Sequence, residues 1–306
     1  MRGETYDALD VTIPAPGGVE LAGHLRVPGA AGGRALVFTG PFTGVKEQVA
    51  GHYAAALAGR GFVTLAFDHR NFGASSGEPR QHEDAAGKGL DLLAATSWLA
   101  EHEAVDAERI GCVGICLGGS YALRHAAFDP RVKALGLVAG GYNDPVWFAE
   151  QFGGSGYRDT LAALADVAGR QLRSGEIEYV PAVDGNGGEA AMPGAEPFEY
   201  YGTERSASPG WVNRMTRLSL REILTLDARA PAPLTAGRPT LMIHGRRDDF
   251  CTPEGAELTF ARLGEPKRLE WLDTTNHIDL YDNPVFVDPA IDLLATFFAE
   301  HLGADS

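Results

Sequence analysis

The sequence predicts an α/β protein with a mostly parallel, twisted sheet, helices on both faces and an inserted cap. Two observations predict this class. Short apolar runs alternate with helical patterns along most of the chain, and such alternation produces a parallel sheet covered by helices. The alternation stops over residues 145–232 and then resumes. The chain of 306 residues, 44% of them hydrophobic, is long enough for one large core, or for one core and a smaller lobe.

The elements before residue 145 follow this alternation in order. Residues 9–27 alternate in polarity on either side of a Pro-Gly-Gly turn, which predicts a hairpin. Further along, apolar runs predict buried strands, and small or apolar residues at helical spacing predict helices. The expected strands are 34–40, 62–68, 109–115 and 132–140, and the expected helices are 45–59, 83–102 and 118–128.

The last part of the chain repeats the pattern after an interruption. Residues 145–232 are rich in Gly, Pro and aromatic residues, yet they contain two amphipathic stretches, 160–172 and 211–224. Because a structureless loop of that length is abnormal in a compact domain, we expect a cap over the carboxyl edge of the sheet, where α/β proteins bind ligands. The strands expected after it are 239–245 and 267–273, and the helices are 253–264 and 289–302. The predicted division is core 1–144, cap 145–232 and core 233–306.

Charge and composition narrow the class of partner. The chain has 41 acidic and 26 basic residues and a net charge of −15, which opposes binding to nucleic acid or anionic lipid. No apolar stretch approaches the roughly 20 residues of a membrane span, and residues 1–23 lack the apolar region of a signal peptide. We therefore expect a cytoplasmic protein that binds a small molecule. The oligomeric state stays open, with a homodimer as one option.

The three cysteines do not have the spacing of a disulfide scaffold. Cys112 and Cys116 lie four residues apart, but no matching pair of Cys or His follows them, so a structural zinc site is not expected. We predict neither a metal nor another cofactor. Reduced thiols can be reactive, and the surroundings of Cys116 favour reactivity.

Residues 114–119, Gly-Ile-Cys-Leu-Gly-Gly, join an expected strand to an expected helix. This is the context of a nucleophile elbow, where the nucleophile stands on a sharp turn. Glycines are needed on both sides because a β-carbon there would collide with the neighbouring strand or helix. The N-terminus of the helix then favours a thiolate. The alternative is a tight turn with a merely buried thiol.

Candidates for an acid and a base follow the elbow in the order that hydrolases use. Asp248 lies three residues after an expected strand, and Asp249 is the alternative if the position slips by one residue. His277 follows the last expected strand, whereas His69 and His244 also lie at strand ends. We predict that Asp248 and His277 complete a triad with the elbow cysteine at the carboxyl edge of the sheet.

An acyl-transfer site also requires an oxyanion hole of two backbone N–H groups. Leu117, directly after the nucleophile, is expected to supply one of them. The other is expected from the loop Thr-Gly-Pro-Phe-Thr-Gly at 39–44. Because Pro41 has no N–H, we predict Phe42.

Several aromatic residues of the cap are candidates to line an acyl pocket, although packing of the cap's own core explains them equally well. An arginine at a strand end could steer a carboxylate, although ion pairs that hold its loop are the stronger explanation. The candidate substrate-binding residues are Trp147, Tyr200, Tyr201, Trp211 and Arg70.

These motifs resemble the dienelactone hydrolase branch of the α/β-hydrolases, whose cysteine nucleophile lies in a similar G-x-C-x-G-G elbow. The segments GPFTGVKEQ, LAFDHRNFGASSGEPRQHED, GICLGGSYAL and HIDLYD are more similar to a bacterial group of YcjY-like hydrolases related to fungal polyketide transferases and thiohydrolases. The resemblance implies the α/β-hydrolase fold, the triad and the oxyanion hole given above. In dienelactone hydrolase a glutamate contacts the thiol where this chain has Pro41, which argues against dienelactone chemistry itself.

We therefore predict a hydrolase that works through an acyl-cysteine. A thiolate leaves a tetrahedral intermediate more easily than an unprotonated amine or an alkoxide does, so thioesters, lactones and enol or aryl esters are the expected substrates. The first alternative is an acyltransferase or cyclase of polyketide-type biosynthesis, in which another acceptor replaces water. The second is a ligand-binding homologue without turnover.

Overall fold

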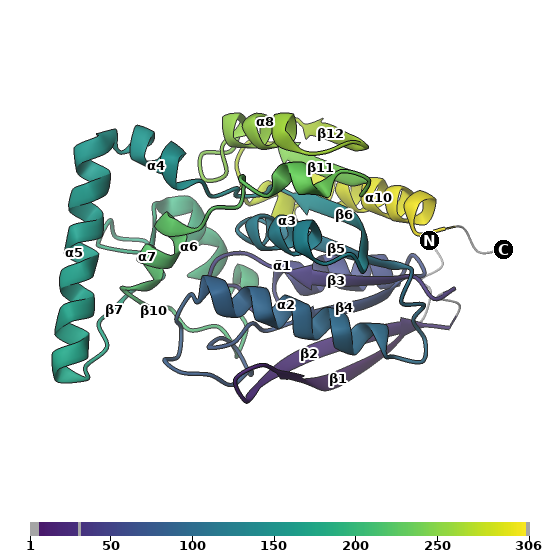
Figure 1. Cartoon of the computed structure of the whole chain (residues 1–306), viewed down its shortest axis with the longest axis horizontal. Helices are drawn as coiled ribbons and strands as arrows, with labels where there is room; N and C mark the ends of the chain where they lie inside the picture. Colours follow the sequence, from purple (N-terminus) through teal and green to yellow (C-terminus); the bar gives the residue numbers. More distant parts are fainter. Residues whose placement is uncertain (1–5, 30–31, 304–306) are drawn as a thin grey trace.

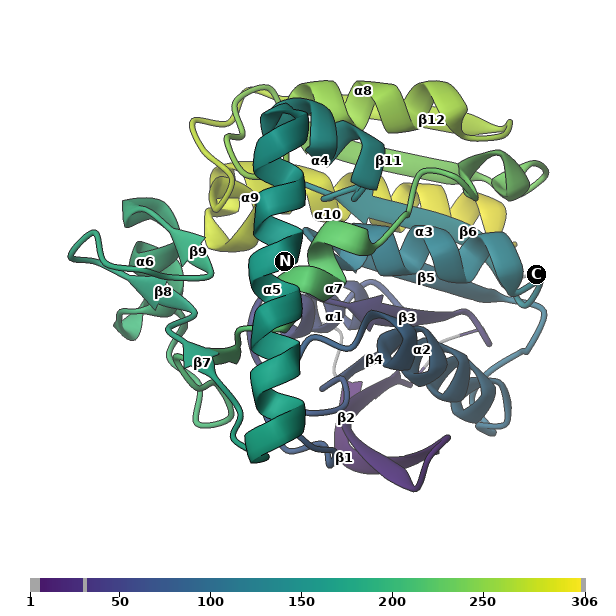
Figure 2. The same ribbon diagram turned by 60° about the vertical axis from the view of Figure 1, so that its left-hand side comes forward.

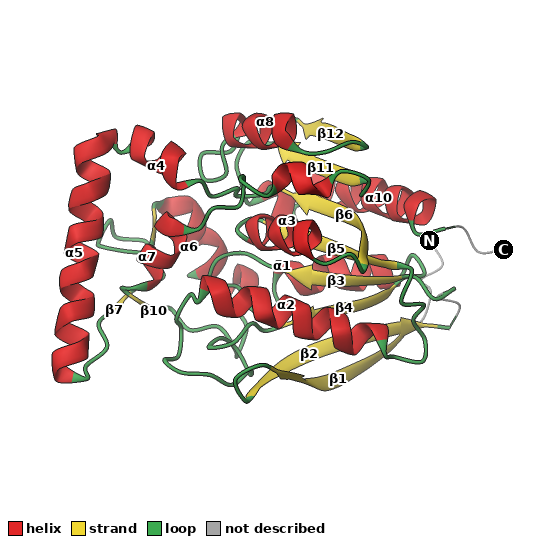
Figure 3. Cartoon of the chain, in the orientation of Figure 1, coloured by secondary structure: helices red, strands yellow, loops and turns green. Residues whose placement is uncertain are grey.

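The computed structural model describes residues 6–29 and 32–303 and contains an eight-stranded sheet (Figures 1 and 3). The strand order is β1-β2-β4-β3-β5-β6-β11-β12. Strands β1 and β2 form an antiparallel hairpin, β2 is also antiparallel to β4, and the remaining pairs are parallel. This confirms the predicted mostly parallel sheet. The bounds are β1 Tyr6–Ala15, β2 Val19–Pro28, β3 Ala35–Thr39, β4 Val63–Phe67, β5 Ile110–Ile115, β6 Val132–Val138, β11 Thr240–Gly245 and β12 Lys267–Leu272.

Helices cover both faces of the sheet, and each face has its own apolar core. Along β3, Val37 packs into one core, whereas Leu36 and Phe38 pack into the other, because successive side chains of a strand point to opposite faces. Helices α2 (Ala85–Ala100), α3 (Gly118–Phe128) and α8 (Pro253–Arg262) cover the first face, and α1 (Val49–Ala58), α9 (Asp279–Asp282) and α10 (Pro284–His301) cover the second. Among the described helices, none is long and apolar enough to cross a membrane.

Two helices of the core start at other residues than predicted. Residues 45–48 form a turn before α1, because Gln48 Oε1 accepts the N–H of Val45 at 3.1 Å. Helix α10 begins at Pro284, and the proline that was expected to start it, Pro289, lies inside. Its true N-cap is Asn283, whose side chain accepts the N–H of Val285. A proline thus indicates that a helix begins nearby, but it does not identify the first residue of the helix.

Residues 145–232 contribute no strand to the eight-stranded sheet, and helices α4 to α7 lie beyond one end of its strands (Figures 1 and 2). Of the amphipathic stretch 211–224 only the second half is helical, in α7, because Thr216 donates its N–H to the carbonyl of Gln81. The division into core and cap stays a prediction. The elements of this segment are α4 Pro145–Gln151, α5 Gly153–Ser174, β7 Tyr179–Val180, β8 Val183–Asp184, β9 Met192–Pro193, α6 Ala195–Tyr201, η1 Glu204–Ser206, β10 Met215–Thr216 and α7 Ser219–Thr225, and η2 Ala232–Thr235 begins at its last residue.

Candidate active site

Cys116 lies on the sharp turn between β5 and α3. Its φ angle is +55°, a left-handed conformation that few non-glycine residues adopt and that is found mainly where function requires it. A β-carbon on Gly114 would lie 2.5 Å from the carbonyl oxygen of Gly118, and one on Gly118 would lie 2.3 Å from the carbonyl oxygen of Thr39. Both glycines are therefore sterically required, as the elbow motif predicts.

The loops after β11 and β12 bring a carboxylate and an imidazole together. Asp248 Oδ2 lies 2.6 Å from His277 Nδ1, and both side chains are buried. The other oxygen of Asp248 accepts the N–H groups of Phe250 and Cys251 at 3.0 and 2.7 Å. His277 Nε2 lies 2.9 Å from the hydroxyl of Tyr281. The carboxylate thus holds the imidazole with Nε2 facing away from Asp248.

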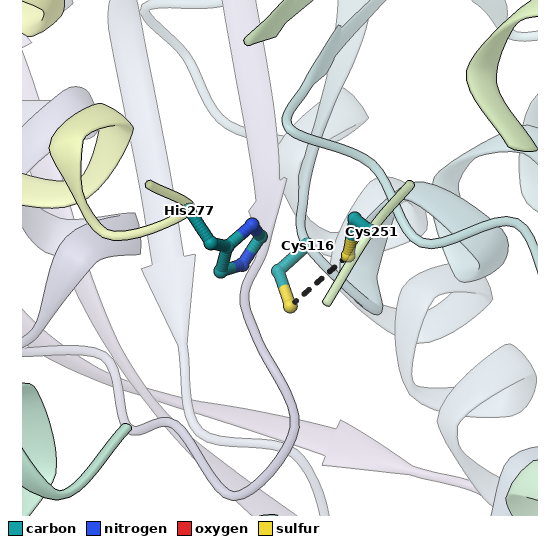
Figure 4. A group of neighbouring side chains, drawn as sticks. All are labelled: Cys116, Cys251 and His277. Carbon is teal, nitrogen blue, oxygen red and sulfur yellow. Dashed lines mark hydrogen bonds between the residues drawn. The ribbon is translucent and has the colours of Figure 1, made fainter. Parts of the chain in front are cut away.

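The third member of the cluster is Cys116, whose sulfur lies 3.9 Å from the sulfur of Cys251 (Figure 4). The sulfurs of both cysteines and a ring nitrogen of His277 lie within 4.8 Å of one another, which makes these three the described side chains that could hold a metal ion. Figure 4 shows the two sulfurs and the imidazole converging from three separate loops.

The electrostatics of this cluster favour a thiolate beside an imidazolium. The hydrogen bond from the Cys251 thiol is the largest cause that lowers the pKa of Cys116 well below its usual value; burial opposes it, and His277 adds to it. Burial alone would lower the pKa of His277, but Asp248 and Cys116 outweigh it and raise that pKa well above the usual value. Cys251, the donor, has a raised pKa and stays a thiol.

The competing candidates do not take the places of Asp248 and His277 in this cluster. Asp249 is exposed, whereas Asp248 contacts the imidazole. His69 binds Thr39 and Asp91, at 2.9 and 3.2 Å, on a different part of the sheet edge. His244 donates its Nε2–H to the carbonyl oxygen of Cys251 at 2.7 Å and so supports this loop.

The predicted oxyanion donors belong to segments that pack against each other. Leu117 begins the turn into α3, and the carbonyls of Thr39 and Gly40 lie against Gly118. Within 6–29 and 32–303, neither the backbone N–H of Leu117 nor that of Phe42 donates a hydrogen bond to the protein. Both residues are buried. The described protein therefore offers neither N–H group an acceptor, and their role as an oxyanion hole stays a prediction.

A cavity of about 40 Å³ adjoins Cys116 and is almost wholly apolar. Part of its wall comes from residues 192–201, so the segment expected to form a cap does reach the elbow. The hydroxyl of Tyr201 is buried there and has no hydrogen-bond partner among the described residues. The lining residues are Cys116, Met192, Glu196, Pro197, Tyr201, Phe250, His277, Ile278 and Tyr281.

The five predicted substrate-binding residues are scattered. Of these only Tyr201 lines the cavity. The ring of Trp211 stacks on the ring of Tyr201, with centroids 5.6 Å apart, and the ring of Tyr200 packs edge-on against that of Tyr201. Trp147 lies in a separate cavity under the guanidinium of Arg229. Arg70 pairs with the buried Asp91 at 2.8 Å. This ion pair holds the loop of Arg70 in place, which is the alternative to steering the carboxylate of a substrate.

Two residues at the centre of the site escaped sequence reasoning. Tyr281 lies four residues after His277, and i, i+4 spacing across a short helix was the available signal for its contact with the imidazole. Cys251 had no signal, because a cysteine three residues after an acid has no recognised meaning.

Comparison with known proteins matches residues 34–283 to a family model described as serine aminopeptidase, S33. The uncharacterised protein YcjY of Escherichia coli K12 is 35% identical over 88% of this chain and 89% of its own length. The polyketide transferase grgF of a Penicillium species is 30% identical over 91% and 92%. The thiohydrolase aneE of Aspergillus aculeatus is 29% identical over 85% and 83%. These are the groups that the sequence motifs resemble, so that resemblance is confirmed.

Two crystal structures share the architecture over nearly the whole chain. Protein PA2218 of Pseudomonas aeruginosa superimposes with a TM-score of 0.86 at 32% identity, covering 97% of this chain and 94% of its own. The α/β hydrolase GrgF superimposes with a TM-score of 0.81 at 26% identity, covering 97% and 99%. The overall fold is therefore common to these proteins.

Proposed function

This chain belongs to the α/β-hydrolases, in the family described as serine aminopeptidase, S33, and has their fold, and we propose that it hydrolyses activated acyl groups through an acyl-cysteine on Cys116. The observation that carries the proposal is the cluster at the elbow. Cys116 faces an imidazole whose other nitrogen is bound by the buried Asp248 at 2.6 Å. Nucleophile, base and orienting acid are the three parts of a catalytic triad.

In the proposed first step the thiolate of Cys116 attacks the acyl carbon. The negative charge that develops on the carbonyl oxygen is met by the N–H groups of Leu117 and Phe42, which have no other acceptor in the described protein. The leaving group departs with the proton of the His277 imidazolium. The neutral imidazole then takes a proton from water, which attacks the acyl-cysteine and releases the acid.

The cysteine sets the substrate class. The family description names a serine, but the elbow of this chain carries Cys116. A cysteine thiolate is a better leaving group from the tetrahedral intermediate than a serine alkoxide is. An unactivated amide whose nitrogen is not protonated would therefore revert to substrate, whereas thioesters, lactones and aryl or enol esters carry leaving groups good enough to depart. The thiohydrolase among the relatives supports this preference.

The cavity supports an apolar acyl group. Its volume of about 40 Å³ is far below the roughly 300 Å³ or more of an ordinary ligand pocket, so it accommodates the reacting carbonyl and little else. We propose that residues 192–201 move outward to admit the rest of the acyl chain.

The test is the mass of the intact protein after incubation with p-nitrophenyl esters, lactones and acyl thioesters. An acyl adduct is expected on the wild type and on Cys112→Ala, whose thiol is fully buried in β5, and it is expected to be lost in Cys116→Ala. Cys251→Ala distinguishes the two neighbouring sulfurs. An adduct that persists in Cys116→Ala, or none with any member of the three panels, would contradict the proposal.

Acyl transfer to another acceptor is a second candidate, favoured by the relatives named as polyketide transferases and as an acyltransferase. The almost wholly apolar lining of the cavity also favours an organic acceptor over bulk water. Product analysis with and without an added alcohol or amine separates the two. Free acid as the sole product in both cases supports hydrolysis, and an acyl-acceptor product supports transfer.

A further inference from the structure

We propose that Cys116, Cys251 and His277 form a binding site for a thiophilic divalent cation, Zn²⁺ above all, and that the bound ion silences the nucleophile. The three donors are two sulfurs and one imidazole nitrogen, a set that suits Zn²⁺. The silencing rests on the proposed function of Cys116, whereas the binding does not. Cys251 is the residue that turns an ordinary Cys–His pair into such a site.

The spacing of the donors fits a tetrahedral ion. Two thiolates bound to one Zn²⁺ at about 2.3 Å, at a tetrahedral angle, lie about 3.8 Å from each other. The sulfurs of Cys116 and Cys251 lie 3.9 Å apart. The imidazole nitrogen lies within 4.8 Å of both, so rotation about the side-chain bonds suffices to close the site.

The surroundings orient the imidazole as a ligand. Asp248 accepts from Nδ1 at 2.6 Å, which is the carboxylate–histidine arrangement that fixes the tautomer at zinc sites and makes Nε2 the ligand atom. The same carboxylate accepts the N–H of Cys251 at 2.7 Å, so one buried group positions two of the three ligands. Tyr281 would give up its hydrogen bond to Nε2 when the ion binds.

A fourth position is open. The cavity of about 40 Å³ that borders Cys116 and His277 has room for one water molecule. Two cysteines, one histidine and a water form a known type of zinc coordination. The chain would thus bind the ion with three of its own side chains and solvent.

Charge and protons balance on binding. The acyl-transfer mechanism proposed above starts from a Cys116 thiolate, a His277 imidazolium and a Cys251 thiol. The ion binds two thiolates and a neutral imidazole, so one proton leaves Cys251 and one leaves His277. Two negative charges then meet two positive ones. The sulfur electron pair that would attack an acyl carbon is bound to the metal.

The first experiment is a titration of the reduced, metal-free, full-length protein with Co²⁺, whose thiolate charge-transfer absorption counts sulfur ligands, followed by displacement with Zn²⁺. One ion per chain with two thiolates is expected. Cys251→Ser and Cys251→Ala should each lose one thiolate from the spectrum and bind Zn²⁺ at least about tenfold more weakly, the low end of what even outer-shell partners contribute. Cys112→Ala, from the same chain but outside the cluster, should match the wild type.

The second experiment tests silencing by the rate at which iodoacetamide alkylates Cys116, followed by mass. Equimolar Zn²⁺ should slow the alkylation of Cys116 at least tenfold in the wild type. In Cys251→Ser it should slow the alkylation of Cys116 much less. Wild-type affinity and spectrum in both Cys251 variants would refute the site. A two-thiolate spectrum without protection would refute silencing. Neither readout uses a substrate, so failure of the proposed acyl chemistry is recognised separately, by the absence of acyl adducts on metal-free protein.

Discussion

Gly118→Ala is the substitution whose effect follows most directly from the geometry of the elbow. The new β-carbon would lie 2.3 Å from the carbonyl oxygen of Thr39 and 2.7 Å from that of Gly40. Real contacts of a β-carbon hardly ever fall below 3.0 Å, so α3 and the loop after β3 must separate by 0.7 Å, from 2.3 to 3.0 Å. Overpacking of this kind costs about 1–3 kcal/mol of the free energy of unfolding.

The same displacement should affect acyl transfer more than stability. The loop that moves leads to Phe42, the proposed oxyanion donor, and a misplacement of about 1 Å can cost on the order of 10²-fold in rate. Urea unfolding followed by circular dichroism measures the first effect, and the rate of acyl-adduct formation measures the second. The matched control is Gly89→Ala in α2, where a β-carbon meets nothing within 4 Å.

The two glycines should therefore respond with opposite signs. Gly89→Ala should stabilise the protein by about 0.5–1 kcal/mol, because alanine in an open helical position orders the chain more cheaply than glycine does, and it should leave acylation unchanged. If Gly118→Ala unfolded at the wild-type urea concentration and acylated at the wild-type rate, the steric account of the elbow would be wrong.

Three further predictions concern the cluster and its cavity. Asp248→Asn should lower the rate of turnover by roughly 10³–10⁴-fold, as loss of the orienting acid does in other triads, and turnover within tenfold of the wild type would exclude a triad. A free thiol is protonated and loses reactivity as the pH falls below its pKa of about 8.5. Because the pKa of Cys116 is lowered, its alkylation by iodoacetamide should stay fast well below that pH. Cys251→Ala should move the fall in alkylation rate to higher pH, because the largest cause of the lowered pKa is removed; an unshifted profile would show that Cys251 has no such effect. Tyr201→Ala should raise kcat/KM for long acyl esters relative to acetyl esters by opening the cavity, whereas Leu172→Ala, on the exposed side of α5, should not.

The fold was largely predictable because its signals are local. Buried parallel strands appear as short apolar runs, and the helices between them have their own periodicity, so the alternation alone indicates the sheet. Predictions were weakest where tertiary contacts overrode local pattern. The amphipathic stretch at 211–224 has the spacing of a helix, but backbone pairing with Gln81 and β7 holds Thr216 in an extended form.

The candidate site divides in the same way. The elbow is a local feature: Cys116 has a positive φ angle, and Gly114 and Gly118 on either side of it have no room for a β-carbon. These requirements can be recognised from neighbouring residues in the sequence. The convergence of Asp248 and His277 with Cys116 was predictable because the carboxyl ends of parallel strands share one edge. The substrate-binding candidates were less predictable, because aromatic side chains that pack a covering segment and those that line a cavity have the same composition.

By itself, the sequence determined the alternating strands and helices, the elbow around Cys116 and the chain order of its proposed partners, because each depends on neighbouring residues or on the common edge of a parallel sheet. Only the tertiary structure decided that the sulfur of Cys251, 135 residues away, lies 3.9 Å from that of Cys116, and that Tyr281 and residues 192–201 line the cavity beside it. Contacts between distant loops depend on how far each loop extends beyond its strand and on how it packs. The spacing of residues within one loop therefore does not predict the distance to a residue in another loop.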